Sequence, residues 1–171
     1  MLKEAGSFFA IAFVLFVGAY VYICSQGSNP NTLFVFTRVV TMPHVLDYHT
    51  LARQDAISNG INPDIFERQI QMESGFNPNA VSQAGAIGIA QIMPGTAAGW
   101  NVDPHDPVAS LSAAATAMAH YYTTYQSYPK ALAAYNAGTS RLDMALARCG
   151  TSWRVCVPAE TQRYIRAIMR A

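Results

Sequence analysis

Prolines where a helix can begin, and glycines where one ends, divide most of this chain into short helices. Proline has a helix-compatible φ but no N–H donor, so it suits the first turn of a helix and disrupts the interior. Glycine readily adopts the left-handed conformation that ends a helix. The residues concerned are Pro63, Pro107, Pro129 and Pro158, and Gly60, Gly75, Gly138 and Gly150. With no alternation of strands and helices along this part, the pattern predicts a mainly α domain.

Apolar spacing and capping residues set the expected helix bounds. Asn62 and Asp106 can each accept hydrogen bonds from the first N–H groups of the helix that follows. Residues 75–99 are rich in Gly, Ala, Ser and Pro, so we expect a loop with one short helix near Ile92. The expected helices are 44–58, 62–73, 109–125, 129–135, 140–149 and 158–170.

An uncharged apolar run of seventeen residues, Phe8–Cys24, stands near the start of the chain. Lys3 precedes it and Arg38 is the next basic residue, which predicts a cytoplasmic N-terminus and an exported body. The run is longer than the roughly 7–15 apolar residues of a signal peptide and ends in tyrosines, which favours an uncleaved transmembrane helix. A cleaved signal helix remains open, because Ser25 and Gly27 permit cleavage.

The chain is therefore interpreted in three parts: a membrane anchor or signal over residues 1–25, a linker of uncertain role over 26–43, and one domain over 44–171. A length of 171 residues suits one core. Strand-forming residues over 33–40 have no clear role. The net charge of +1 gives no field that favours nucleic acid. We expect the domain in the periplasm or cell envelope, anchored in the inner membrane or exported after cleavage.

Two of the three cysteines are candidates for a disulfide. Cys149 and Cys156 lie seven residues apart, and an exported location permits them to oxidise. Two unpaired thiols are the alternative. Cys24 ends the apolar run, but Tyr22 and Ile23 replace the small residues that lipid attachment needs. The histidines lack ligand-like spacing to the cysteines, so no metal site is expected.

Glu73 is the acid whose surroundings suit acid–base chemistry. It ends an expected helix beside Gly75, with Met72 and Phe76 as apolar neighbours. A carboxyl group withdrawn from water keeps its proton nearer neutral pH and can donate it to a leaving oxygen. A surface glutamate at the end of an amphipathic helix would share these features, so composition and spacing leave the role open.

Four strings in order change that balance. They are ESGFNPNAVS over 73–82, GAIGIAQIMPGTA over 85–97, AYNAG over 134–138 and PAETQRYI over 158–165. Together they resemble the lytic transglycosylases of glycoside hydrolase family 23, over nearly the whole body. One departure is Ala90, where the family usually carries Met, with Ile89 in place of Leu.

The resemblance implies a lysozyme-like domain whose groove holds alternating N-acetylmuramic acid and N-acetylglucosamine. Glu73 would be the catalytic acid and then the base. Glu160 would support the site from the last helix. No metal or organic cofactor is implied. The residues expected to bind substrate are Ser82, Gln91, Met93, Tyr135 and Asn136.

A lytic transglycosylase needs one carboxyl group, because the substrate's own C6 hydroxyl attacks the anomeric carbon and leaves a 1,6-anhydromuramic end. A hydrolytic muramidase on the same fold is an alternative, with Asp103 or Asp106 as a second acid, although capping explains both. Another is a non-catalytic glycan-binding or envelope-assembly protein. Partners would be peptidoglycan strands, the membrane through the N-terminal segment, and a secretion, conjugation, pilus or phage-entry assembly, with a place in the virion if the source is a phage.

Overall fold

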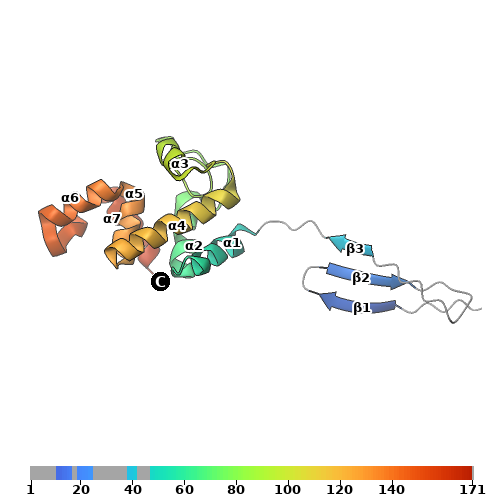
Figure 1. The fold of residues 1–171 in the computed structure, drawn as a ribbon. Coiled ribbons are helices and arrows are strands. Elements are labelled where there is room, and N and C mark those ends of the chain that lie inside the picture. The colour runs from blue at the N-terminus through green and yellow to red at the C-terminus, as the bar shows by residue number, and fades with distance from the viewer. Residues whose placement is uncertain (1–10, 17–18, 25–37, 42–46, 171) are drawn as a thin grey trace, which may run out of the picture. The chain divides into compact units, whose positions relative to one another are not determined.

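The computed structural model describes residues 11–16, 19–24, 38–41 and 47–170. These residues belong to two compact units, one within residues 1–46 and the other within 47–171. The second unit contains the four strings of the sequence analysis. Figure 1 traces both units in order along the chain.

The first unit contains three strands in an antiparallel sheet with the order β1-β2-β3. The strands are β1 (Ile11–Phe16), β2 (Ala19–Cys24) and β3 (Arg38–Thr41). Ile11 pairs with Cys24, and Tyr22 pairs with Arg38. The expected strand over 33–40 overlaps β3 at residues 38–40, while 33–37 lie outside the described residues.

The strands β1 and β2 cover part of the run for which the sequence analysis expected a helix, and the role of that run as a membrane anchor or signal stays a prediction. The run is rich in Val, Ile, Phe and Tyr, which favour strands. A continuous apolar run has no period that separates a helix from a buried strand, so its pattern is compatible with both. Across the described ranges, none of the helices combines the length and the apolar character needed to span a bilayer.

The second unit is built from helices, most of them joined by short connections, with a longer non-helical segment between α2 and α3 (Figure 1). Its elements are α1 (Tyr48–Ser58), α2 (Pro63–Ser74), α3 (Pro94–Trp100), α4 (Pro107–Tyr125), α5 (Tyr128–Ala137), α6 (Thr139–Cys149), the 3-10 helix η1 (Gly150–Cys156) and α7 (Ala159–Met169).

The helix starts follow the predicted capping. Asn62 Oδ1 accepts from the N–H groups of Asp64 and Ile65 at 2.9 and 3.2 Å. Asp106 Oδ1 accepts in the same way from the second and third residues of α4. The first helix begins at Tyr48, behind an Asp47 cap that the sequence analysis did not identify; residues 44–46 lie outside the described part. The short helix expected near Ile92 is α3, and η1 was not predicted.

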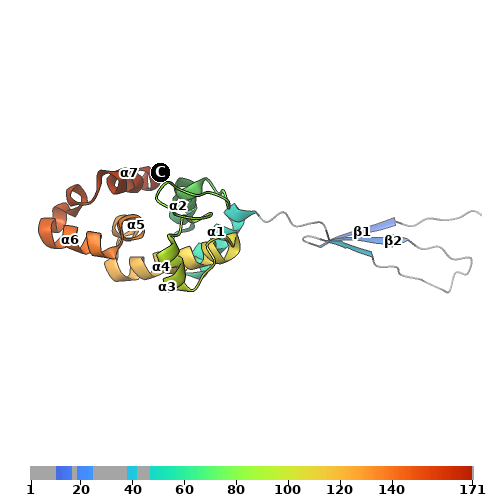
Figure 2. The ribbon, with the colours of Figure 1, turned by 90° about the horizontal axis from the view of Figure 1, so that it is seen from above.

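The long helix α4 joins two groups of helices. It packs against α1 on one side and α5 on the other, while α7 packs against α5 and α2. Figure 2 shows α1 and α2 toward one end of the unit and α6 at the other, with α5 and α7 between them. The α4 side chains that fill the centre are fully buried: Leu111, Ala114, Ala115 and Met118. The low polarity of α4 follows from its position, because it packs against helices on two sides. Its small alanines let those helices approach closely.

The segment between α2 and α3 forms tight turns rather than helix. Val81 bridges to Ile87, and Ile87 bridges to Ile92. Gly88 has a φ of +75°, and a Cβ there would lie 2.1 Å from the carbonyl oxygen of Pro104. Only glycine fits this close approach, so it fixes the segment against the start of α4.

The C-terminal helices are joined by a covalent bond. Cys149 ends α6, and a disulfide connects it to Cys156, at the end of η1, with the two Cα atoms 6.5 Å apart. Trp153, which lies between the two cysteines in the sequence, is buried. The bond fixes the short η1 segment between α6 and α7.

Candidate functional site

Glu73 is the penultimate residue of α2, and the chain fixes its position from both sides. Gly75 ends the helix in the left-handed conformation with a φ of 64°. The Ser74 hydroxyl then donates to the carbonyl oxygen of Ile89 at 2.6 Å. The end of α2 is therefore tied to the turns that precede α3.

Glu73 is half-buried, and its carboxyl group has one strong hydrogen-bond donor. The Tyr164 hydroxyl, from α7, donates to Glu73 Oε1 at 2.5 Å. Burial raises the pKa of Glu73 from 4.5 to about 7, although the Tyr164 hydrogen bond lowers it in part. The negative end of the α2 dipole also disfavours a carboxylate there. Near neutral pH this group can therefore both donate and accept a proton.

A cleft of about 430 Å³ opens beside Glu73. Its walls come from α2, the turns before α3, the end of α5 and the start of α7. All seven residues that the resemblance singled out line this one cleft: Glu73, Ser82, Gln91, Met93, Tyr135, Asn136 and Glu160. Residues far apart in sequence are thus brought around a single carboxyl group.

Two of the lining residues also hold the turns in shape. Gln91 has a φ of 49°, and its side-chain amide donates to the carbonyl oxygens of Gly88 and Ala80 at 2.9 and 3.3 Å. The Ser82 hydroxyl accepts from the backbone N–H of Ala86 at 2.9 Å. These bonds keep the wall opposite α7 rigid, which suits a site that must hold a substrate in one orientation.

The α5 wall is fixed by hydrogen bonds to its neighbours. The Tyr135 hydroxyl donates to the carbonyl oxygen of Ala90 at 2.9 Å, and its ring lies 6.3 Å from that of Trp100. Burial, followed by the nearby charge of Glu73, raises the pKa of Tyr135 well above 10, so its hydroxyl keeps its proton. Asn136 Oδ1 accepts from the Thr161 hydroxyl of α7 at 2.8 Å.

Sequence reasoning assigned no role to Tyr164 and Arg163. Tyr164 lay inside the quoted string PAETQRYI, but nothing in the string showed that its hydroxyl reaches Glu73. The signal available was its spacing from Thr161 and Ile168, which places it on the buried face of α7. Arg163 lines the cleft as its one basic side chain among the described residues.

The candidate second acids of the hydrolytic alternative lie elsewhere. Asp103 Oδ1 accepts from the N–H of His105 at 2.9 Å, and Asp106 caps α4. Neither lines the cleft, where the acids among the described residues are Glu73 and Glu160. Glu160 is exposed in the first turn of α7, where the helix dipole favours a negative charge.

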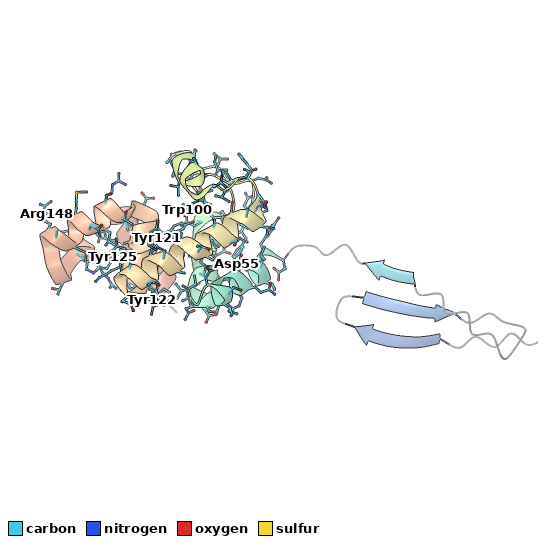
Figure 3. The ribbon with its side chains drawn as sticks, viewed as in Figure 1. Asp55, Trp100, Tyr121, Tyr122, Tyr125 and Arg148 are labelled. Atoms are coloured by element: carbon cyan, nitrogen blue, oxygen red, sulfur yellow. A yellow bond between two sulfur atoms is a disulfide. The ribbon has the colours of Figure 1, made fainter. Side chains whose placement is uncertain are left out.

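A larger hollow, of about 580 Å³, lies between the end of α3 and one face of α4. Figure 3 shows two of its aromatic residues, Trp100 and Tyr121, in this region. Its other lining residues are small or polar, and no Asp or Glu is among those the structure describes there. The residues of the family strings line the smaller cleft around Glu73 rather than this hollow, so the smaller cleft is the candidate active site.

Comparison with known proteins identifies the same segment. Residues 50–152 match the family model described as the transglycosylase SLT domain. The chain is 32% identical over 82 residues to a protein named "Transglycosylase" from Enterobacteria phage PRD1, covering 47% of this chain and 31% of that protein. It is also 46% identical over 50 residues to "Membrane-bound lytic murein transglycosylase C" from Actinobacillus pleuropneumoniae serotype 5b, covering 29% of this chain and 14% of that protein.

The solved structures agree on the fold. The 70 kDa soluble lytic transglycosylase from Escherichia coli superposes with a TM-score of 0.63 at 24% identity, over 71% of this chain and 22% of that one. The mainly helical, lysozyme-like architecture expected from the sequence is thus confirmed for the helical unit. The chain spans less than a third of the length of each of these relatives.

Proposed function

The chain belongs to the transglycosylase SLT domain family, and we propose that it is a peptidoglycan lytic transglycosylase with Glu73 as its catalytic acid and base. The bond cleaved is the β-1,4 linkage between N-acetylmuramic acid and N-acetylglucosamine. The observation that carries the proposal is the half-buried Glu73, whose pKa is raised to about 7, in a cleft lined by Tyr135, Gln91 and other residues of the family strings.

In the first step, protonated Glu73 donates its proton to the glycosidic oxygen. The bond between that oxygen and the anomeric carbon breaks, and the N-acetylglucosamine side leaves with a free hydroxyl. The positive charge at the anomeric carbon is stabilised by the substrate's own N-acetyl group. A pKa of about 7 leaves a large protonated fraction at neutral pH, which this step requires.

In the second step, the Glu73 carboxylate removes the proton from the C6 hydroxyl of the muramic acid, and that oxygen bonds to the anomeric carbon. The product is a 1,6-anhydro ring, no water is consumed, and Glu73 is protonated again. The Tyr164 hydroxyl, 2.5 Å from Oε1, stabilises the transient carboxylate and orients it. The sugar ring holds the attacking hydroxyl close to the anomeric carbon, which replaces a second protein acid.

A comparison of two variants tests the role of Glu73. Purified peptidoglycan is incubated with the wild type, Glu73→Gln and Glu160→Gln, and the release of soluble fragments is measured. We expect Glu73→Gln to lose roughly 100-fold or more, because proton transfer is removed. Glu160→Gln, in the first turn of α7 at the same cleft, should lose much less, because its proposed role is to support the site rather than to transfer a proton. Equal activity of Glu73→Gln and wild type would refute the assignment.

The hydrolytic muramidase is distinguished by running the reaction in water enriched in heavy oxygen. A transglycosylase incorporates none of the label at the new muramic end, whereas a muramidase incorporates one atom per bond cleaved. Binding to peptidoglycan without any cleavage would instead support a glycan-binding or envelope-assembly protein.

We propose that the protein acts in the cell envelope, through an apolar run that anchors it or directs its export. The supporting observations are the seventeen uncharged residues Phe8–Cys24 and the Cys149–Cys156 disulfide, a bond typical of oxidising compartments. Cell fractionation with N-terminal sequencing tests this. Recovery of the intact chain in membranes indicates an anchor, a shortened soluble form indicates a cleaved signal, and intact chain in the cytosol contradicts the proposal.

A local role follows as a further proposal: delivery by a secretion, conjugation, pilus or phage-entry assembly that needs an opening in the wall. The phage protein among the relatives is the supporting observation. Crosslinking in membranes or virions, followed by identification of the crosslinked proteins, would show whether such an assembly is present.

A further inference from the structure

A second hollow with a distinctive chemistry lies between α6 and the segment that leads into α7. It has a volume of about 390 Å³. One wall is a single face of α6, formed by Arg141, Met144, Ala145 and Arg148, at the spacing of successive helical turns. The other wall is residues 156–158, which the disulfide at Cys156 fixes to the end of α6. Figure 3 shows Arg148 near the end of α6.

Within the described part of the chain, neither of the two arginines at this hollow forms a salt bridge. Among the residues that the structure describes, the salt bridges of basic side chains involve only Arg53 and His49. Asp143, also on α6, accepts a hydrogen bond from the Tyr125 hydroxyl at 2.8 Å and does not line the hollow. Arg141 donates a long hydrogen bond to the carbonyl oxygen of Ala137 at 3.4 Å, which leaves its charge unpaired, so an anion entering the hollow would meet two guanidinium groups without breaking a salt bridge among the described residues.

The surrounding charge has the same sign. Residues 128–171 contain seven Lys and Arg and only two Asp and Glu, whereas residues 47–127 contain two Lys and Arg and seven Asp and Glu. The near-zero net charge of the chain conceals this division. The α5–α7 end is thus positive as a whole, which favours approach of an anionic group to this end rather than to the other.

The hollow adjoins the active-site cleft. Asn136 and Glu160 line the cleft, while Arg141 and Pro158 line the hollow, so the same two chain segments form an edge of both. The hydrogen bond between Thr161 and Asn136 joins these segments. A polymer bound in the cleft would have its side groups next to the hollow on this side.

We propose that the hollow binds a carboxylate of the peptide stem carried by a muramic acid beside the scissile bond. The proposal rests on the transglycosylase function above. The stem is attached to the sugar through its lactyl group and carries free carboxylates, the planar anions that arginine binds in a two-pronged geometry. The buried Val157 and the exposed Met144 give the hollow apolar surface for the short aliphatic groups next to the carboxylate. The arginines would thus select strands that still carry their peptides.

Two forms of one substrate test this: uncross-linked glycan strands with their stem peptides, and the same strands after an amidase has removed the peptides. The full chain in mild detergent is compared with Arg141→Gln/Arg148→Gln and with the control Arg166→Gln, an exposed arginine of α7 that lines neither the hollow nor the cleft. Rates of bond cleavage give kcat/KM. The Glu73→Gln background gives the Kd for each strand without turnover.

We expect the double variant to lose roughly tenfold in kcat/KM and in affinity on peptide-bearing strands, as two charge-assisted contacts near the surface are removed. Its loss on stripped strands should be several-fold smaller, and added salt should reduce the difference. Arg166→Gln should behave as wild type on both. Circular dichroism checks the fold, and Arg148→Gln alone serves if the double variant is unstable.

Equal losses on both strands would overturn the proposal, because the arginines would then act on the glycan or on the fold. No loss on either would mean that they are merely solvated. Loss of binding to anionic phospholipid vesicles, with binding to strands unchanged, would assign the hollow to a membrane surface instead. Failure of wild type to cleave either strand would refute the transglycosylase function, while the Kd comparison would still decide the peptide contact.

Discussion

Replacing Glu73 by glutamine should stabilise the folded protein at alkaline pH. Glutamine keeps an oxygen that can accept from Tyr164, but it has no charge to bury. Below pH 4.5 the carboxyl group is protonated in both folded and unfolded chains, so it contributes no difference. Between pH 4.5 and about 7 the unfolded chain releases the proton while the folded chain retains it, so the wild type loses stability as pH rises.

The size of this effect follows from the shift in pKa. A rise from 4.5 to about 7 corresponds to roughly 3 kcal/mol at 1.36 kcal/mol per pKa unit. Because the side chain borders an open cleft, we expect about 2 kcal/mol. Urea unfolding at pH 5 and pH 8, followed by circular dichroism, measures it.

The control is Glu67→Gln. The pKa of Glu67 is lowered, chiefly by hydrogen bonds from His49 and Arg53, so its carboxylate stabilises the fold at pH 8 and this variant should be less stable there. The reasoning is refuted if Glu73→Gln gains no more stability at pH 8 than at pH 5.

Three further perturbations follow from the geometry. Tyr164→Phe removes the donor to Glu73, so the pKa of that carboxyl group should rise by roughly 1 unit and the alkaline limb of the pH profile of kcat/KM should move to higher pH; an unmoved or acid-shifted limb would contradict this. Gly88→Ala should destabilise by about 2 kcal/mol or more in thermal unfolding, because its Cβ has no space, whereas Gly99→Ala in α3 should be neutral or stabilising; equal Tm values would count against the close approach. Cys149→Ser should lower the free energy of unfolding by roughly 2–3 kcal/mol, because the disulfide is lost. A reducing agent should destabilise the wild type but not this variant, and a wild type that is insensitive to the reducing agent and as stable as the variant would contradict the bond.

Much of the helical unit was predictable from local chemistry. Asn62 and Asp106 are caps that act within three residues, so their effect can be read without knowledge of the fold. Gly75 and Gly138 similarly end helices where they were expected to do so. The N-terminal run gave no such local signal, and its uniform apolar character is compatible with both a helix and strands.

The site was predictable only in part. Glu73 and its cleft neighbours were found through ordered strings, which carry information that composition does not. Tyr164 was missed because its contact with Glu73 joins residues ninety-one positions apart and depends on how α7 packs against α2. The hollow beside Arg141 and Arg148 depends on the path of η1, which follows from the packing of Trp153 as well as from the Cys149–Cys156 bond, and that packing has no local signature.

The central claim is tested most directly by mass spectrometry of the fragments released from purified peptidoglycan by the wild type and by Glu73→Gln. We predict muropeptides with 1,6-anhydromuramic ends from the wild type and none from the variant. Reducing-ended fragments, heavier by one water, would contradict the transglycosylase mechanism, and anhydro-ended fragments from Glu73→Gln at the wild-type rate would contradict the role of Glu73.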